Sequence, residues 1–266
     1  MALPPPATGS TVLVTGASSG IGAELARELA RRGYDLVLAA RREERLAELA
    51  AELRSRHGVE AAVEAVDLAD AAAREALAER LLENGEVVGV CNNAGFGHVG
   101  AFLRAGAGRQ VEMVRLNVEA VVALTAAFLP PMVSRGTGAI LNVASIAAHQ
   151  PLPAMATYAA SKAFVLSLSE AVHGELAGTG VSVTCVCPGP THSEFGEKAG
   201  LGETEEQAPE LLFMESAAVA REAIAGMVAG RRVVTPGLGN KALAVGGRLV
   251  PRTLLLPAAL RFGRAL

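Results

Sequence analysis

Cysteine is scarce in this chain of 266 residues, which contains only Cys91, Cys185 and Cys187. An odd, small number of cysteines in a chain of this length excludes a disulfide-built scaffold, and their strand-like surroundings predict buried, reduced thiols. Cys185 and Cys187 lie two apart on one predicted strand, but no further Cys or His pair stands at metal-ligand spacing. No metal site is therefore predicted.

An excess of positive charge is also missing, since 24 basic residues face 27 acidic ones and the net charge is −3. This balance excludes a nucleic-acid-binding protein with an overall basic surface. No apolar run approaches the roughly 20 residues of a membrane-spanning helix. The first ten residues, MALPPPATGS, carry no Lys or Arg and do not resemble a secretory signal. We therefore expect a cytoplasmic protein whose residues 1–10 form an extended lead-in.

Short apolar runs alternate regularly with helical patterns along the chain, and 51% of the residues are hydrophobic, which suits one large domain. Strands are predicted at 11–15, 35–40, 59–66, 87–91, 138–145, 181–187 and 231–236. Helices are predicted at 21–33, 43–57, 70–84, 109–135, 155–178 and 216–229. This alternation predicts an α/β fold, a doubly wound parallel sheet of about seven strands with helices on both faces.

Two stretches at the predicted carboxyl ends of strands carry the chemistry. TGASSGIG (15–22) offers glycines for a tight turn and close approach of a phosphate to a helix N-terminus, although a turn that binds nothing is the alternative. Its spacing is not the G-x-G-x-x-G fingerprint. Tyr158 and Lys162, four apart, share one helix face. With two tyrosines and three lysines in the chain, chance gives such a pair about two times in a hundred.

The Tyr158–Lys162 pair has a bland interpretation, a surface tyrosine beside a solvated lysine, and a chemical one. A free tyrosine has a pKa of about 10, too high for acid–base work near neutral pH. A neighbouring ammonium group favours the phenolate, so Lys162 is predicted to lower the pKa of Tyr158.

At this point the chain resembles the short-chain dehydrogenases/reductases over about residues 11–236. The resemblance rests on TGASSGIG, VDLAD (66–70), NNAG (92–95), LNV (116–118), Ser145, YAASK (158–162) and PGP (188–190). It implies a nicotinamide-dependent oxidoreductase on a Rossmann-like sheet, acting as a homodimer or homotetramer on a small-molecule carbonyl or alcohol.

The resemblance also implies roles for particular residues. Tyr158 gives or takes the proton at the substrate oxygen, Ser145 hydrogen-bonds that oxygen, Lys162 holds the nicotinamide ribose, and Asn117 anchors a water that connects Lys162 to solvent. Asp67 accepts a hydrogen bond from the adenine amino group. The candidate cofactor-binding residues are Gly16, Ser18, Ser19, Gly20, Ile21, Gly22, Arg41, Asp67, Leu68, Asn93, Ala94, Gly95, Tyr158, Lys162, Pro188, Gly189, Thr191 and Ser193. Either Thr191 or Ser193 stands for the threonine that the family has after its Pro-Gly.

The end of the second strand, AARRE (39–43), bears on the choice of cofactor. NAD-binding members of the family usually have an acid there, whereas this chain has Arg41 and Arg42. A guanidinium group grips a phosphate with paired, charge-assisted hydrogen bonds, and Ser18 could add a hydroxyl. Arg41 therefore indicates NADP(H), with a pair of solvated arginines as the alternative.

Substrate information is limited to apolar residues in the predicted pocket loops, a feature that suits an apolar and, as one option, acyl or lipid-like substrate. These residues are Phe96, Ile146, Leu152, Phe195, Leu211, Leu212 and Phe213, and the loop 192–215 is expected to form a lid. The function predicted is NADP(H)-dependent interconversion of a carbonyl and an alcohol. The alternative is a dinucleotide-binding regulatory or membrane-associated protein with little catalysis.

A C-terminal extension, residues 237–266, follows the family's core. Seven basic and no acidic residues follow Glu222, interspersed with leucines and valines. Pro251 and Pro257 are expected to divide the segment into short helices. One interpretation is a tail over the substrate pocket or a partner subunit; the other is a basic amphipathic segment, residues 239–266, on an anionic membrane.

Overall fold

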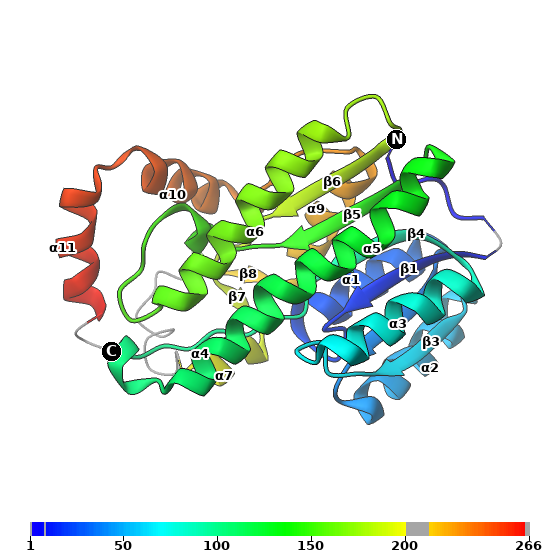
Figure 1. The fold of residues 1–266 in the computed structure, drawn as a ribbon, viewed down its shortest axis with the longest axis horizontal. Helices are drawn as coiled ribbons and strands as arrows, with labels where there is room; N and C mark the ends of the chain where they lie inside the picture. Colours follow the sequence, from blue (N-terminus) through cyan, green and yellow to red (C-terminus); the bar gives the residue numbers. More distant parts are fainter. Residues whose placement is uncertain (1, 8, 201–212, 264–266) are drawn as a thin grey trace.

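A parallel sheet of seven strands organises the chain in the computed structural model, which describes residues 2–7, 9–200 and 213–263 (Figure 1). The strand order is β3-β2-β1-β4-β5-β6-β9, so the chain first builds outward from β1 to β3 and then returns to place β4 on the other side of β1. The strands are β1 Ser10–Thr15, β2 Asp35–Ala40, β3 Ala61–Ala65, β4 Glu86–Asn92, β5 Gly138–Val143, β6 Val181–Val186 and β9 Val233–Val234. The predicted fold class, a doubly wound sheet, is confirmed.

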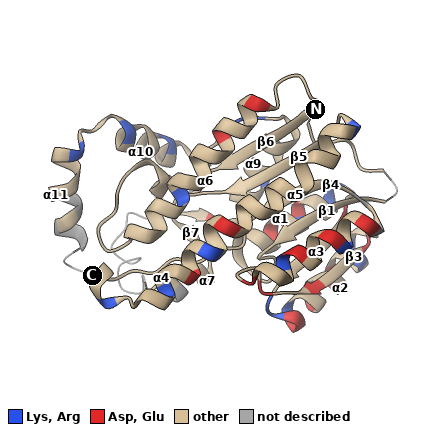
Figure 2. Cartoon of the chain, in the orientation of Figure 1, with Lys and Arg blue, Asp and Glu red and all other residues tan. Residues whose placement is uncertain are grey.

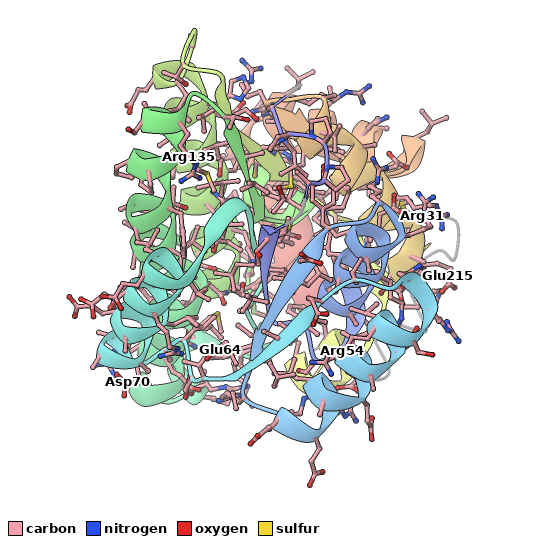
Figure 3. All side chains as sticks on the ribbon, turned by 90° about the vertical axis from the view of Figure 1, so that its right-hand side faces the viewer. Arg31, Arg54, Glu64, Asp70, Arg135 and Glu215 are labelled. Carbon is pink, nitrogen blue, oxygen red and sulfur yellow. The ribbon has the colours of Figure 1, made fainter. Side chains whose placement is uncertain are left out.

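Two layers of helices bury the two faces of this sheet. One layer is α1 (Gly20–Arg31), α2 (Glu43–His57) and α9 (Ser216–Val228), and the other is α3 (Ala71–Asn84), α5 (Ala120–Arg135) and α6 (Ala156–Glu175). Figure 3, seen from the β3 edge, shows the sheet between these layers, with Asp70 at the start of α3. The Asp70 carboxylate caps α3 by accepting from the amides of Ala72 (2.9 Å) and Ala73 (3.2 Å).

The helix predicted at 109–135 is interrupted. It comprises α4 (Ala107–Val114), one π-helical turn (Arg115–Glu119) and then α5. A π turn inserts one residue into the helical repeat and is common at functional sites, and here it contains the buried Asn117. By length and composition alone, Ala107–Arg135 could cross a membrane. However, Leu124 and Phe128 are buried against the sheet, as expected for the core helix of a domain.

The two ends of the chain behave differently. The lead-in is packed on the domain: Leu3 is 1% exposed, and the carbonyl of Pro4 accepts a 2.6 Å hydrogen bond from the Tyr34 hydroxyl. At the other end, α10 (Leu238–Leu249) packs against the turn Ile146–His149, whereas α11 (Arg252–Gly263) extends away from the sheet (Figure 1). Two short strands, β7 (Thr191–His192) and β8 (Met214–Glu215), pair in parallel, and α7 (Glu194–Ala199) follows β7.

Candidate active site

The glycine-rich turn after β1 brings two backbone segments into contact. A Cβ atom built on Gly22 would lie 2.2 Å from the carbonyl oxygen of Gly16, so no other residue fits at position 22 without moving the turn. Gly16 itself has a φ of +67° and Gly20 one of +54°. Ser19 is the N-cap of α1, but its side chain makes no capping hydrogen bond. The first amides of α1 are therefore available to an anion beside the turn.

The ends of β1 and β4 are tied together by Thr15, a residue for which sequence reasoning assigned no role. The Thr15 hydroxyl accepts hydrogen bonds from the amides of Asn93 (2.9 Å) and Ala94 (3.0 Å). The Asn93 side-chain amide in turn donates to the Thr15 carbonyl at 2.9 Å. Asn93 and Ala94 thus lie beside the glycine turn, where the strand order reverses, and the Asn93 side chain helps to hold the two strand ends at a fixed spacing.

The two arginines after β2 point to different partners. Arg42 donates from Nε to the Ser18 hydroxyl (3.1 Å) and from Nη2 to the Ser19 hydroxyl (2.7 Å). Arg41 is mostly exposed, and its Nη1 lies 3.9 Å from carboxylate oxygens of both Asp67 and Glu112. In the cofactor-free chain the guanidinium group at Ser18 therefore belongs to Arg42, and the prediction that Arg41 and Ser18 meet a 2′-phosphate stays a prediction.

Asp67 and Leu68 follow β3. The Asp67 side chain is about half exposed, and its Oδ1 accepts a 3.0 Å hydrogen bond from the amide of Ala69. Leu68 is buried, and Ile21, at the start of α1, is half-buried. Asp67 thus stands at the carboxyl end of the sheet on the same side as Arg41.

Tyr158 and Lys162 both lie buried on one face of α6, as their spacing predicts. The Lys162 ammonium donates to the Val143 carbonyl at 2.8 Å, at the end of β5, and lies 5.8 Å from the centre of the Tyr158 ring. Ser145 follows the same strand, and its hydroxyl is placed to lower the pKa of the Tyr158 phenol. The end of β5 therefore holds both the lysine and the serine beside the tyrosine.

Burial changes the acid–base properties of this pair. It raises the pKa of Tyr158 to about 12, against the opposing effect of the Ser145 hydrogen bond. It also lowers the pKa of Lys162 to about 8, because an ammonium group loses hydration inside the protein. In the cofactor-free chain desolvation is thus the largest effect on the pKa of Tyr158, and the lowering of that pKa by Lys162 stays a prediction.

Asn117, on the π turn, lies close to this group. Its Oδ1 accepts from the amide of Phe96 (3.1 Å), and its Nδ2 donates to the carbonyl of Phe96 (2.9 Å) and to the Ser161 hydroxyl (3.1 Å). A Cβ built on Gly95 would lie 2.9 Å from Asn117 Oδ1 and 3.5 Å from Lys162 Nζ. Gly95 therefore sits directly against both side chains, and the four predicted catalytic residues meet at one place.

The loop after β6 supplies the remaining predicted residues. The Pro188 carbonyl accepts a 2.9 Å hydrogen bond from the amide of Ile146, and Gly189 packs against Asn240 of α10. The Thr191 hydroxyl donates to the Gly189 carbonyl (2.9 Å), and the Ser193 hydroxyl donates to the carbonyl of Thr191 (3.3 Å). Both hydroxyls are engaged within their own loop, so the choice between them stays open.

Apolar side chains surround Tyr158. Tyr158, Met113 and Ala147 form a buried cluster on which Phe96, Leu152, Met155 and Phe195 pack. The Phe195 ring lies 5.5 Å from the Tyr158 ring at 48°, so α7 covers the tyrosine. Of the other pocket residues predicted, Ile146 is half-buried in the turn after Ser145, and Phe213 stacks on His192 at 4.9 Å. Leu211 and Leu212 lie outside the described residues.

No group of three or more His, Cys, Asp or Glu side chains placed to hold a metal ion occurs within residues 2–7, 9–200 and 213–263. All three cysteines are buried and free of disulfides, as predicted.

The reversal of strand order beside the glycine turn and the Tyr158–Lys162 pair define a Rossmann-like oxidoreductase. The sequence model of the family described as short chain dehydrogenase matches residues 10–204. The chain therefore belongs to the short-chain dehydrogenase family.

Among curated relatives, "Probable oxidoreductase EphD" of Mycobacterium tuberculosis is 41% identical over 180 residues, which are 67% of this chain and 30% of that protein. The chain thus matches about a third of the length of that relative. The very-long-chain 3-oxoacyl-CoA reductase of Pyrenophora tritici-repentis is 36% identical over 183 residues, 67% of this chain and 54% of that protein.

Solved structures agree over nearly the whole chain. A short-chain dehydrogenase from Sphingobium yanoikuyae in complex with NADPH has a TM-score of 0.82 at 38% identity, covering 93% of this chain and 95% of that one. A short-chain dehydrogenase/reductase from Burkholderia phymatum in complex with NAD has a TM-score of 0.80 at 26% identity, covering 89% of this chain and 92% of that one. Relatives of both cofactor classes therefore share this fold.

Proposed function

We propose that the protein is an NADP(H)-dependent oxidoreductase that interconverts a carbonyl and an alcohol on an apolar substrate. The observation that carries this proposal is the convergence of Tyr158, Ser145, Lys162 and Asn117 beside Gly95. A bound nicotinamide would supply or accept the hydride, and the protein would orient the reactants and move the proton. Residues 11–236 form the catalytic unit, and 237–266 form an extension from it.

Each of the four side chains has a task in this proposal. Tyr158 donates its phenolic proton to the substrate oxygen during reduction and takes it back during oxidation. Ser145, which acts on the pKa of that phenol, orients the same substrate oxygen. Lys162 would hold the nicotinamide ribose and stabilise the phenolate, and Asn117 would connect Lys162 to solvent.

The residues at the carboxyl end of the sheet fit a dinucleotide. Close contact of Gly16 with Gly22 leaves the start of α1 bare, and Gly95 leaves space beside Lys162, so backbone can approach a pyrophosphate and a ribose. Arg42 with Ser18 and Ser19 would hold a 2′-phosphate, and Asp67 would meet the adenine. This donor set supports NADP(H), because no acidic side chain ends β2 to receive free ribose hydroxyls.

Turnover of NADPH tests the proposal. The purified protein should oxidise NADPH in the presence of apolar ketones, aldehydes or long-chain 3-oxoacyl compounds, and NADH should be used more slowly. The apolar cover formed by Phe96, Leu152 and Phe195 supports such substrates. Tight NADPH binding with no turnover of any carbonyl would instead favour a cofactor-binding regulator.

Exposed apolar side chains on two surfaces support assembly with partners. Phe102 (61% exposed), Val114 (44%) and Phe164 (44%) lie on the outer surface of α4 and α6 and the turn before them, and they support a homodimer or homotetramer. Light scattering of the purified protein measures this oligomeric state.

The C-terminal helices carry a second proposal, peripheral contact with an anionic membrane. Leu238 (83% exposed), Leu249 (76%) and Leu254 (68%) stand among Lys241, Arg248 and Arg252. Figure 2 shows basic but no acidic residues on α10 and α11. Exposed leucines between cations suit a surface of anionic lipids. Of the five basic residues in the segment 239–266, Arg264 lies outside the described residues. A cytoplasmic protein would then be partly membrane-attached.

Vesicle sedimentation tests this second proposal. The full-length protein should sediment with vesicles that contain phosphatidylglycerol at low salt and be released as salt rises. A chain truncated after Val250, which keeps α10 on the domain, should bind less. Sedimentation unchanged by the truncation, or absent at low salt, contradicts membrane contact; a change from dimer to monomer would show that α11 serves a subunit interface.

A further inference from the structure

Glu194, the first residue of α7, contacts two arginines: Arg42, which faces the glycine turn, and Arg45, at the start of α2. Its Oε2 lies 2.8 Å from Arg42 Nη1, and its Oε1 is hydrogen-bonded to Arg45. Arg42 and Glu194 are 152 residues apart in the chain, and each side chain is about one-third exposed. The Arg42 guanidinium group, which faces Ser18 and Ser19, is therefore already paired with the carboxylate of Glu194, in the predicted lid 192–215.

The same three-residue stretch also covers the catalytic tyrosine. Ser193 lies beside the glycine turn, where a Cβ built on Gly20 would be 3.2 Å from the Cβ of Ser193. Phe195 packs on the Tyr158 ring. Residues 193–195 thus contact the glycine turn, the arginines and the tyrosine at once, so that a displacement of Glu194 displaces the Phe195 cover with it.

We propose that Glu194 couples the 2′-phosphate subsite to the cover over Tyr158. In the absence of cofactor, Arg42 and Arg45 hold Glu194, and Phe195 shields Tyr158. When Arg42 turns to a 2′-phosphate, Glu194 leaves it and α7 carries Phe195 away from Tyr158. This inference rests on the proposed NADP(H) function and adds to it a positioning residue that favours cofactor binding before substrate binding.

Electrostatics gives the direction of the coupling. A phosphate monoester carries close to two negative charges at neutral pH, and Glu194 contributes another within the span of one guanidinium group. Because two negative charges at this separation repel each other, Arg42 binds either the phosphate or the Glu194 carboxylate more strongly than it binds both together. A ligand without a 2′-phosphate leaves the Arg42–Glu194 pair in place, so the coupling acts on NADP(H) and spares NAD(H).

Binding of adenosine fragments tests the proposal without turnover. Calorimetry with 2′,5′-ADP and with 5′-AMP isolates the contribution of the 2′-phosphate. Glu194→Gln should bind 2′,5′-ADP about three- to tenfold more tightly than the wild type and 5′-AMP equally well, in keeping with the modest strength of partly exposed ion pairs. Glu194→Asp should behave like the wild type. Glu48→Gln, which removes an exposed charge one helical turn from Arg45 without touching Arg42, is the matched control.

Hydrogen exchange of residues 194–199 supplies the second readout. It should increase when the wild type binds 2′,5′-ADP but not 5′-AMP, and in Glu194→Gln it should be fast without any ligand. The coupling is overturned if the wild type and Glu194→Gln bind 2′,5′-ADP with equal affinity. It is also overturned if Glu48→Gln increases that affinity as much as Glu194→Gln does. If the wild type prefers 2′,5′-ADP and Arg42→Ala loses that preference, the NADP(H) proposal stands even then. If the wild type shows no such preference, both proposals fail.

Discussion

Removing the Arg42 guanidinium group should weaken the use of NADPH selectively. Arg42→Ala deletes the donors that now bind Ser18 and Ser19 and that would face a 2′-phosphate. Arg41→Ala is the matched control, because it removes an identical side chain from the neighbouring position, where the nearest carboxylate oxygens are 3.9 Å away. The two variants therefore separate the guanidinium that contacts the glycine turn from the one beside it.

The size of the effect follows from the charge and exposure of the site. A hydrogen bond to a charged group contributes about 1.5–3 kcal/mol. Because the Arg42 side chain is 35% exposed and solvent screens its charge, we count only one such hydrogen bond. Since about 1.4 kcal/mol is a factor of ten, kcat/KM for NADPH should fall roughly 10- to 150-fold in Arg42→Ala. The value for NADH should change less than about threefold, and Arg41→Ala should lose less than about fivefold with NADPH.

Steady-state kinetics with both cofactors measures the ratio, and the fluorescence of bound NADPH measures affinity directly. The chain has no tryptophan, so protein emission does not obscure that signal. An unchanged preference between NADPH and NADH in Arg42→Ala would refute the assignment of the 2′-phosphate to this residue. If kcat/KM for NADPH falls further in Arg41→Ala than in Arg42→Ala, the 2′-phosphate subsite lies beside Asp67 instead.

Three further substitutions test the rest of the site. Tyr158→Phe should lower kcat about 10²–10⁴-fold while NADPH affinity stays within about twofold, and retention of a tenth of the activity would exclude Tyr158 as the acid. Lys162→Met should be stabilised relative to the wild type at pH 7. Burial lowers the folded-state pKa of Lys162 to about 8 from an ordinary 10.5, so the wild-type penalty is complete below pH 8 and is lost as the pH rises to 10.5. The stability difference, measured by urea unfolding, should therefore shrink by about 2–3 kcal/mol between pH 7 and 10, and a constant difference would contradict a buried charge. Gly22→Ala should abolish NADPH binding in calorimetry and lower the free energy of unfolding by about 1–3 kcal/mol, because its Cβ would meet the Gly16 carbonyl at 2.2 Å; unchanged binding would mean that the turn does not shape the cofactor site.

The fold could be predicted because its determinants are local. The apolar run at 11–15, the glycine turn after it and the helical period that follows define a βα unit within some 20 residues, and the pattern repeats. The placement of Tyr158 and Lys162 on one face of α6 is also local, since residues four apart in a helix always share a face. The predicted ends of strands and helices lie within a few residues of the observed ones, as with the strand predicted at 59–66 and found at Ala61–Ala65.

Other features depend on packing between segments that are distant in the chain. Periodicity indicated one helix at 109–135, but the π turn that turns Asn117 toward Phe96 and Ser161 requires their positions in the folded protein. The pKa of Tyr158 likewise depends on burial as well as on its neighbour in sequence, and burial is decided by Phe195 and the residues packed with it.

The sequence by itself determined the sheet, its order of alternating elements and the residues available at the strand ends, because these follow from short-range patterns of polarity and turn chemistry. Only the tertiary structure decided which of two adjacent arginines meets the glycine turn and which carboxylate meets that arginine. Arg41 and Arg42 are indistinguishable as letters, and they separate because the chain turns from β2 into α2 between them. Glu194 reaches Arg42 from 152 residues away, and no local pattern encodes a contact at that distance.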